Sequence, residues 1–223
     1  MTEPAARRIS PWWLLPPVLL FAGNAIALNT ASAADTRNGV YRGSVVAQAL
    51  LSAVVFGGYA LLAARLSRVP VRSALALRRP ADLRRSAVMV VAAVVAISAV
   101  SLVLEPFLHG DRDQGLTPTR LPSGQEWLIL GLALVVLGLL VPLGEELLFR
   151  GLGFATLGRF AVPGTAVGFA LAHGLLALLV PVLVAGVALA ELRRRSGSLW
   201  PGVATHSAIN LLGILLALAT ASR

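Results

Sequence analysis

Long apolar runs are the feature of this 223-residue sequence that most restricts its fold. Three of them, Ser44–Leu66, Ser86–Leu108 and Trp127–Leu143, reach or approach the roughly 20 residues that a helix needs to cross the hydrocarbon core of a bilayer. Inside lipid, a single segment can satisfy all of its backbone hydrogen bonds only as a helix. The sequence therefore predicts an all-α, polytopic transmembrane bundle.

The composition agrees with a membrane protein and excludes several other classes. Hydrophobic residues make up 57% of the chain and charged residues 13%, which is too few charges for the surface of a soluble protein. The net charge of +9 comes without a basic face of interleaved aromatic residues, so nucleic acid is not an expected partner. Cysteine is absent, which excludes disulfides, thiolate metal sites and a cysteine nucleophile.

The first apolar run, from about Trp12 to Ala33, has two interpretations. Its end, Ala31-Ser32-Ala33, resembles a signal-peptidase site, as in a signal peptide that is cleaved. However, the run is longer than the apolar part of a typical signal peptide, and Trp12 and Trp13 fit an aromatic belt at the membrane interface. We therefore interpret this run as a retained span.

The second half of the chain supplies the remaining spans. A helix that contains several polar residues is expected to follow Trp127–Leu143 and to extend to about Phe160. It is followed by apolar segments at Ala161–Leu175, Leu176–Leu192 and Pro201–Ala219. The total is about seven spans. We expect residues 1–110 to provide spans without motifs and residues 125–215 to form the catalytic core.

The charges of the loops alternate along the chain. Arginines gather after the second, fourth and sixth spans, whereas the loop after the third span is acidic, with Glu105, Asp111, Asp113 and Glu126. A seven-span arrangement with a cytoplasmic N-terminus puts every arginine-rich loop on one side, as the positive-inside rule requires. We expect an integral protein of a bacterial cell membrane, surrounded by the lipid bilayer.

Glu145, Glu146 and Arg150 form the first of three polar clusters in the last third of the chain. Ionisable groups at membrane depth are costly, and each is therefore a functional candidate. Glu146 and Arg150 lie four residues apart on a helix and can pair. Glu145 is rotated by about 100° from Glu146 around the helix axis, so it is expected to face away from the ion pair and to be free to act as a base. An ordinary charged helix end is the alternative.

The other two clusters repeat a one-turn spacing. Phe169 and His173 share a face of one apolar segment, and His206 and Asn210 share a face of the final span. The alternatives are a structural histidine with a backbone or hydroxyl partner, and a hydrogen-bonding pair between helices. His109, in the acidic loop, is expected to be solvated.

Together the clusters bring a carboxylate, two imidazoles and an amide from three helices. A carboxylate with a histidine can activate water as a general base, and a second histidine with an asparagine can donate to a developing oxyanion. Glu145, His173 and His206 can instead ligate a divalent metal such as zinc.

At these residues the sequence resembles the CPBP family of intramembrane proteases, which includes the CAAX-protease and bacteriocin-processing or Abi proteins. That family is marked by EExxxR, FxxxH and HxxxN motifs in this order. Here they are Glu145-Glu146…Arg150, Phe169…His173 and His206…Asn210. The segment Ser196–Pro201 also looks typical of the family. The resemblance covers about residues 125–215, and its motifs are specific only in combination.

The resemblance implies a hydrolase that cleaves peptide bonds within the membrane. In that family pattern, Glu145 and His173 would activate water, and His206 and Asn210 would stabilise the oxyanion. Glu146, Arg150 and Phe169 would organise the site. A metal-free glutamate peptidase is favoured over a metalloprotease, because without an HExxH motif the spacing gives no independent evidence for zinc. No cofactor is therefore assigned.

The expected partner is a peptide or protein substrate in the membrane, and two other classes remain open. A non-catalytic bacteriocin-immunity or membrane scaffold protein would keep the polar core for packing alone. A small proton-coupled transporter would use the glutamate and histidines as a relay, but transporters commonly show repeats or paired broken helices, and neither is evident here.

Overall fold

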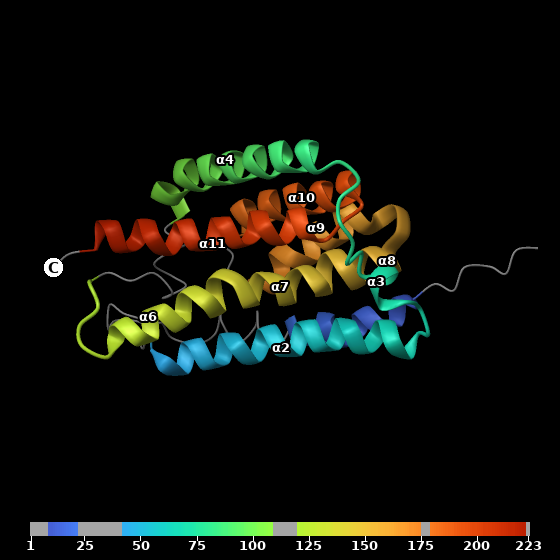
Figure 1. Ribbon diagram of the computed structural model, residues 1–223, viewed down its shortest axis with the longest axis horizontal. Coiled ribbons are helices and arrows are strands. Elements are labelled where there is room, and N and C mark those ends of the chain that lie inside the picture. Colours follow the sequence, from blue (N-terminus) through green and yellow to red (C-terminus); the bar gives the residue numbers. More distant parts are fainter. Residues whose placement is uncertain (1–8, 22–41, 109–119, 175–178, 222–223) are drawn as a thin grey trace, which may run out of the picture.

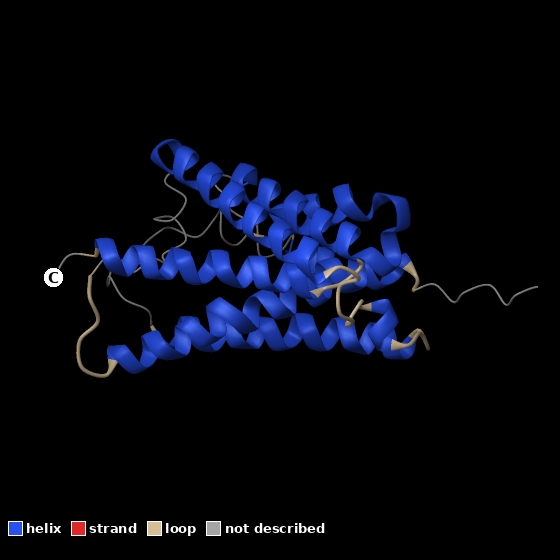
Figure 2. Cartoon of the chain, turned by 45° about the horizontal axis from the view of Figure 1, so that its top comes forward, coloured by secondary structure: helices blue, strands red, loops and turns tan. Residues whose placement is uncertain are grey.

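The computed structural model describes residues 9–21, 42–108, 120–174 and 179–221. All secondary-structure elements assigned in these ranges are helices. The longest helices run side by side along the long axis of the molecule (Figure 1). Figure 2 shows these helices together with the loops of the described residues. The predicted all-α bundle is therefore confirmed.

Four helical stretches of the described residues are long and apolar enough to cross a membrane. They are α2 (Gly43–Leu66), residues Leu83–Leu104 of α4 (Leu83–Leu108), the stretch Glu126–Ala172, and α11 (Trp200–Thr220). The chain is thus an integral membrane protein, but the expected number of about seven spans is not reached in the described part.

Two of the expected spans account for part of this difference. Of the first apolar run, the structure describes only a short apolar helix, Pro11–Phe21, and the possible signal-peptidase site lies outside the described residues. The helix α10 (Leu179–Ser196) continues beyond the expected end at Leu192 and includes Arg193, Arg194 and Arg195 in its last turn. Cations at this end of a helix interact favourably with its dipole.

The stretch Glu126–Ala172 is a series of helical segments. In order they are α6 (Glu126–Val135), the π-helix η2 (Val136–Leu140), α7 (Val141–Glu146), the π-helix η3 (Leu147–Gly153), α8 (Phe154–Leu157), the 3₁₀-helix η4 (Gly158–Phe160) and α9 (Ala161–Ala172). Gly158 has a positive φ of 54°, which favours glycine. The chain turns there, so that α9 packs back against η3.

Close packing around this stretch determines where its polar residues lie. α2 packs along α7 and η3, α10 packs against α9, α4 and α11, and α11 contacts η2 and α7. Two glycines allow backbones to meet: a Cβ at Gly144 would lie 2.5 Å from the Ala53 carbonyl oxygen, and one at Gly186 would lie 3.0 Å from that of Ala166. The motif-bearing helices are thus held at short distances from each other.

Candidate active site

A buried ion pair is the centre of the site. Glu146 ends α7 and Arg150 lies one turn later in η3, and the Arg150 Nη1 donates to Glu146 Oε1 at 2.8 Å. Both side chains are fully buried. Arg150 Nη2 also donates to the Gly186 carbonyl of α10 at 2.9 Å. The structure therefore contains the pair that the four-residue spacing predicts, and the arginine connects three helical segments.

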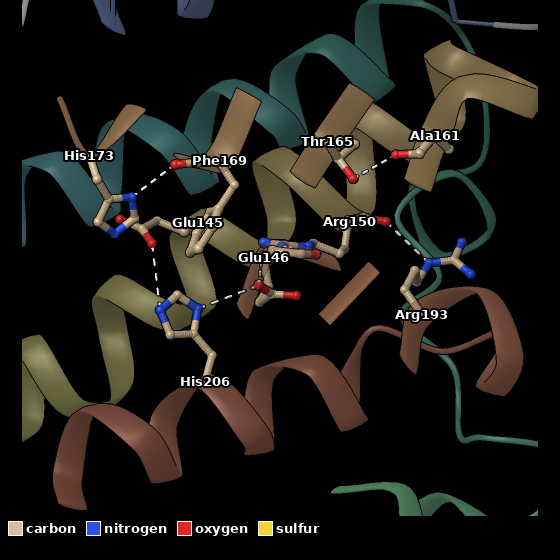
Figure 3. Close-up of polar contacts among 10 residues, drawn as sticks. Glu145, Glu146, Arg150, Ala161, Thr165, Phe169, His173, Arg193 and His206 are labelled. Carbon is tan, nitrogen blue, oxygen red and sulfur yellow. Dashed lines mark hydrogen bonds and ion pairs between the residues drawn. The ribbon is translucent and has the colours of Figure 1, made fainter. Parts of the chain in front are cut away.

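His206 reaches both glutamates from α11 (Figure 3). Its Nε2 lies 3.7 Å from Glu145 Oε2, and its Nδ1 lies 3.4 Å from Glu146 Oε1. These are ion-pair distances for a protonated ring, and the His206 Nδ1 forms no hydrogen bond. The expectation that Glu145 faces away from Glu146 is therefore incomplete: one imidazole, inserted between them, contacts both carboxylates despite the rotation between adjacent residues.

Several polar atoms of this cluster are buried without a hydrogen-bond partner. They are Glu145 Oε2, Glu146 Oε2, His206 Nδ1 and Arg150 Nε. Buried polar atoms are nearly always paired in folded proteins, and those that are not require an explanation. Concentrated at one point, they form a region suited to a polar reactant.

Gly202 lets α11 approach the carboxylates. A Cβ at this position would lie 2.6 Å from Glu146 Oε2, so a larger residue would collide with this carboxylate. Gly202 lies one turn before His206 and so shares its face of α11. This spacing is the signal through which the sequence could have included Gly202 in the site.

His173 lies at the end of α9 with a defined ring orientation. Its Nδ1 is 2.9 Å from the Phe169 carbonyl oxygen. Because a carbonyl oxygen only accepts, the Nδ1 carries the proton of this bond, and the Nε2 of the neutral ring has a lone pair. The Phe169 ring contacts both imidazoles, with centroid distances of 4.7 Å to His173 and 5.5 Å to His206.

Asn210 lies one turn beyond His206 and binds the backbone of another helix. Its Nδ2 donates to the Leu137 carbonyl oxygen of η2 at 2.9 Å. The amide has two N–H groups, so one remains after this bond. His109, the third histidine of the chain, lies outside the described residues.

The metal alternative can be compared with the positions of the donors. Among the described residues, no three or more His, Asp or Glu side chains are arranged to hold a metal ion together. The trio Glu145, His173 and His206 thus does not form a ligand set here.

Arg193, which the sequence analysis treated only as a loop charge, contacts the site from outside. Its Nε donates to the Arg150 carbonyl oxygen at 3.1 Å (Figure 3). Its guanidinium lies 5.2 Å from the centre of the Phe154 ring. No spacing rule connects residues 43 positions apart, so the sequence held no signal for this contact.

The comparison with protein families agrees with the motifs. Residues 126–212 match the family model described as type II CAAX prenyl endopeptidase Rce1-like. Over this part of the 223-residue chain, the sequence is similar to the Rce1-like family. The resemblance to CPBP and CAAX-type intramembrane proteases is thereby confirmed, and the match supports an intramembrane endopeptidase in general terms. Searches of curated proteins and of solved structures found no significant match.

Proposed function

We propose that this protein hydrolyses peptide bonds in the membrane with Glu145 as the general base. The observation that carries the proposal is the contact of one imidazole, His206, with both Glu145 and Glu146 in the buried part of an Rce1-like segment. Structural ion pairs do not need the unpartnered oxygen of Glu145 or a second histidine nearby. General-base catalysis needs both a free acceptor and polar groups around it.

In the proposed reaction, a water molecule is held by Glu145 Oε2 and the Nε2 lone pair of His173. Glu145 takes one proton as the water oxygen bonds to the carbonyl carbon of the scissile peptide. The electrons of the C=O double bond move to its oxygen, and this oxyanion accepts from His206 and from the remaining N–H of Asn210. The C–N bond then breaks, and the proton on Glu145 passes to the leaving amine.

Glu146 and Arg150 have a different role in this proposal. Their ion pair is fully buried and is tied to the Gly186 carbonyl, so it fixes the helix turn that carries Glu145. The Phe169 ring lies between the Arg150 guanidinium, 4.4 Å from its centre, and the two imidazoles. These three residues are proposed to orient the reacting groups without touching the substrate.

The proposed substrate is a peptide or a membrane-associated protein. The name of the matched family points to CAAX prenyl proteins, and a peptide of this class is a suitable probe. We also propose that the protein lies in a bacterial cell membrane with a cytoplasmic N-terminus. Reporter fusions at Asp111 and at Arg194 should report opposite sides of the membrane, and the same side for both would contradict the seven-span arrangement.

Replacing Glu145 by glutamine tests the proposal directly. Glutamine preserves shape but cannot accept the proton, so cleavage of an internally quenched, prenylated CAAX peptide by purified protein should fall by roughly 10²–10⁴-fold. Mass spectrometry of membrane peptides from cells with either protein extends the test to natural substrates. Yield and melting temperature should stay at the wild-type level.

Glu191→Gln is the matched control, because this carboxylate pairs with Arg194 and Arg195 at the partly exposed end of α10. It should leave cleavage unchanged. Full activity in a well-folded Glu145→Gln protein would contradict the role of Glu145 as the general base. A wild-type protein that changes no peptide in either assay would favour the scaffold interpretation.

A further inference from the structure

The short N-terminal helix Pro11–Phe21 is attached to α2 near both of its ends. Near its beginning, the Tyr59 hydroxyl of α2 donates to the Trp13 carbonyl oxygen at 2.8 Å. At its last residue, the Phe21 ring meets the Phe56 ring of α2 edge to face, with a centroid distance of 5.3 Å. This helix lies more than 100 residues before the segment that matches the Rce1-like family.

A continuous series of ring contacts leads from Phe21 to the candidate active site. Phe21 stacks on Phe149 of η3, with centroids 5.6 Å apart and planes at 18°. Phe149 in turn meets Phe169 edge to face at 5.3 Å and 89°. The Phe169 ring then contacts His173 and His206. Each step has the geometry that aromatic pairs prefer.

The two middle rings of this series have little freedom to move. Phe149 is 8% exposed and Phe169 is 2% exposed. The Arg150 guanidinium lies 4.4 Å from the centre of Phe169, and a Cβ at Gly168 would already be 3.7 Å from the Phe149 ring. Because packed interiors transmit displacements, the ring that stacks on Phe149 restrains Phe169 as well.

We propose that Phe21 is a positioning residue of the active site, which acts through Phe149 and Phe169 to hold the rings of His173 and His206. The inference rests on the proposed function, and it extends the functional unit beyond the family segment to the N-terminal helix. Without the Phe21 ring, Phe149 gains space on its stacked face, Phe169 follows it, and both imidazoles lose a defined orientation. Misplacement of reacting groups by about 1 Å is enough to reduce a rate by about 100-fold.

The test compares ring removal with ring retention at one position. Phe21→Met keeps a long apolar side chain but removes the ring, Phe21→Leu is a second ring-free variant, and Phe21→Tyr retains the ring. Phe107→Leu is the control, since Phe107 is 77% exposed on α4. With the quenched peptide, the ring-free variants should lose about 10- to 100-fold in kcat while KM stays within about 3-fold. Phe21→Tyr and Phe107→Leu should match the wild type.

A second readout does not depend on turnover. The chain has three histidines, so selective ¹⁵N labelling of histidine gives a simple imidazole spectrum in detergent. The ring-free Phe21 variants should shift or broaden the signals of His173 and His206, whereas Phe107→Leu should not. Unchanged imidazole signals, or wild-type kcat in Phe21→Met and Phe21→Leu, would overturn the role of Phe21. Full activity of Glu145→Gln would instead overturn the proposed function, so the two failures are distinguishable.

Discussion

Two helical regions of this protein differ in how far their side chains are exposed at the surface of the bundle. Along α4, large apolar side chains such as Val91, Val95 and Leu102 are more than 60% exposed, as expected for a surface that faces lipid. Across α7 and η3, the structure instead buries every residue from Glu146 to Gly153, including a charged pair. Lipid imposes a high cost on charges, so these residues must be enclosed by neighbouring helices.

The difference teaches that the position of the charges, more than hydrophobicity, determines how this bundle packs. α4 packs against α10 and α11, with Ile97 buried at 3% exposure, and its opposite side is apolar and exposed. The α7–η3 region has only one acceptable orientation, in which Arg150 reaches both Glu146 and the Gly186 carbonyl. Substitutions in this region should therefore have large effects, and matched substitutions on α4 should have small ones.

The largest effect on stability is expected from Glu146→Gln. This change leaves Arg150 as a buried charge without a carboxylate, and breaking a buried pair costs about 3–5 kcal/mol. We expect a low yield and a strongly reduced midpoint in denaturant titrations in detergent. Glu191→Gln, at an exposed pair, should change the midpoint far less.

A double variant sharpens this comparison. Glu146→Gln combined with Arg150→Met removes both charges, so it should be more stable than Glu146→Gln alone. If the single Glu146→Gln variant had wild-type stability, the pair would not determine the packing of α7 and η3.

An intermediate effect is expected from Gly144→Ala. The added methyl group would lie 2.5 Å from the Ala53 carbonyl oxygen, which belongs to the backbone of α2 and cannot rotate away. Overpacking of this kind costs about 1–3 kcal/mol. Gly58→Ala in α2 is the control, since no atom lies within 4 Å of its Cβ position. That variant should be as stable as the wild type or slightly more stable, and equal behaviour of the two would contradict the close contact of α2 with α7.

Much of this arrangement could be predicted from the sequence because membrane helices and paired charges follow simple periodicities. The all-α class follows from the apolar runs, and the Glu146–Arg150 pair follows from a four-residue spacing. Contacts between distant segments carry no such signal. The approach of Gly202 to Glu146, the bond from Arg193 to the Arg150 carbonyl, and the ring series from Phe21 depend on how the helices assemble.

The number of spans was harder to predict for a different reason. Hydropathy identifies apolar length but does not reveal π-helical turns, and two of them, η2 and η3, join α6 to α8 in one helical path. The charged end of α10 likewise makes that helix less apolar than its first turns suggest. The roles of Glu145, His173, His206 and Asn210 stay predictions, because geometry alone does not identify the base.

The smallest effect is expected from Leu102→Val on the exposed side of α4. Leu102 is 68% exposed, so the methylene that the substitution removes contacts detergent or lipid and not other side chains. Its removal therefore leaves no cavity. The free energy of unfolding in detergent should change by no more than about 0.5 kcal/mol. Leu152→Val is the matched substitution in η3, where Leu152 is fully buried, and it should cost about 0.5–1.5 kcal/mol because a cavity forms. If Leu102→Val were as costly as Leu152→Val, the outer side of α4 would be a packing surface, and the contrast between the two regions would fail.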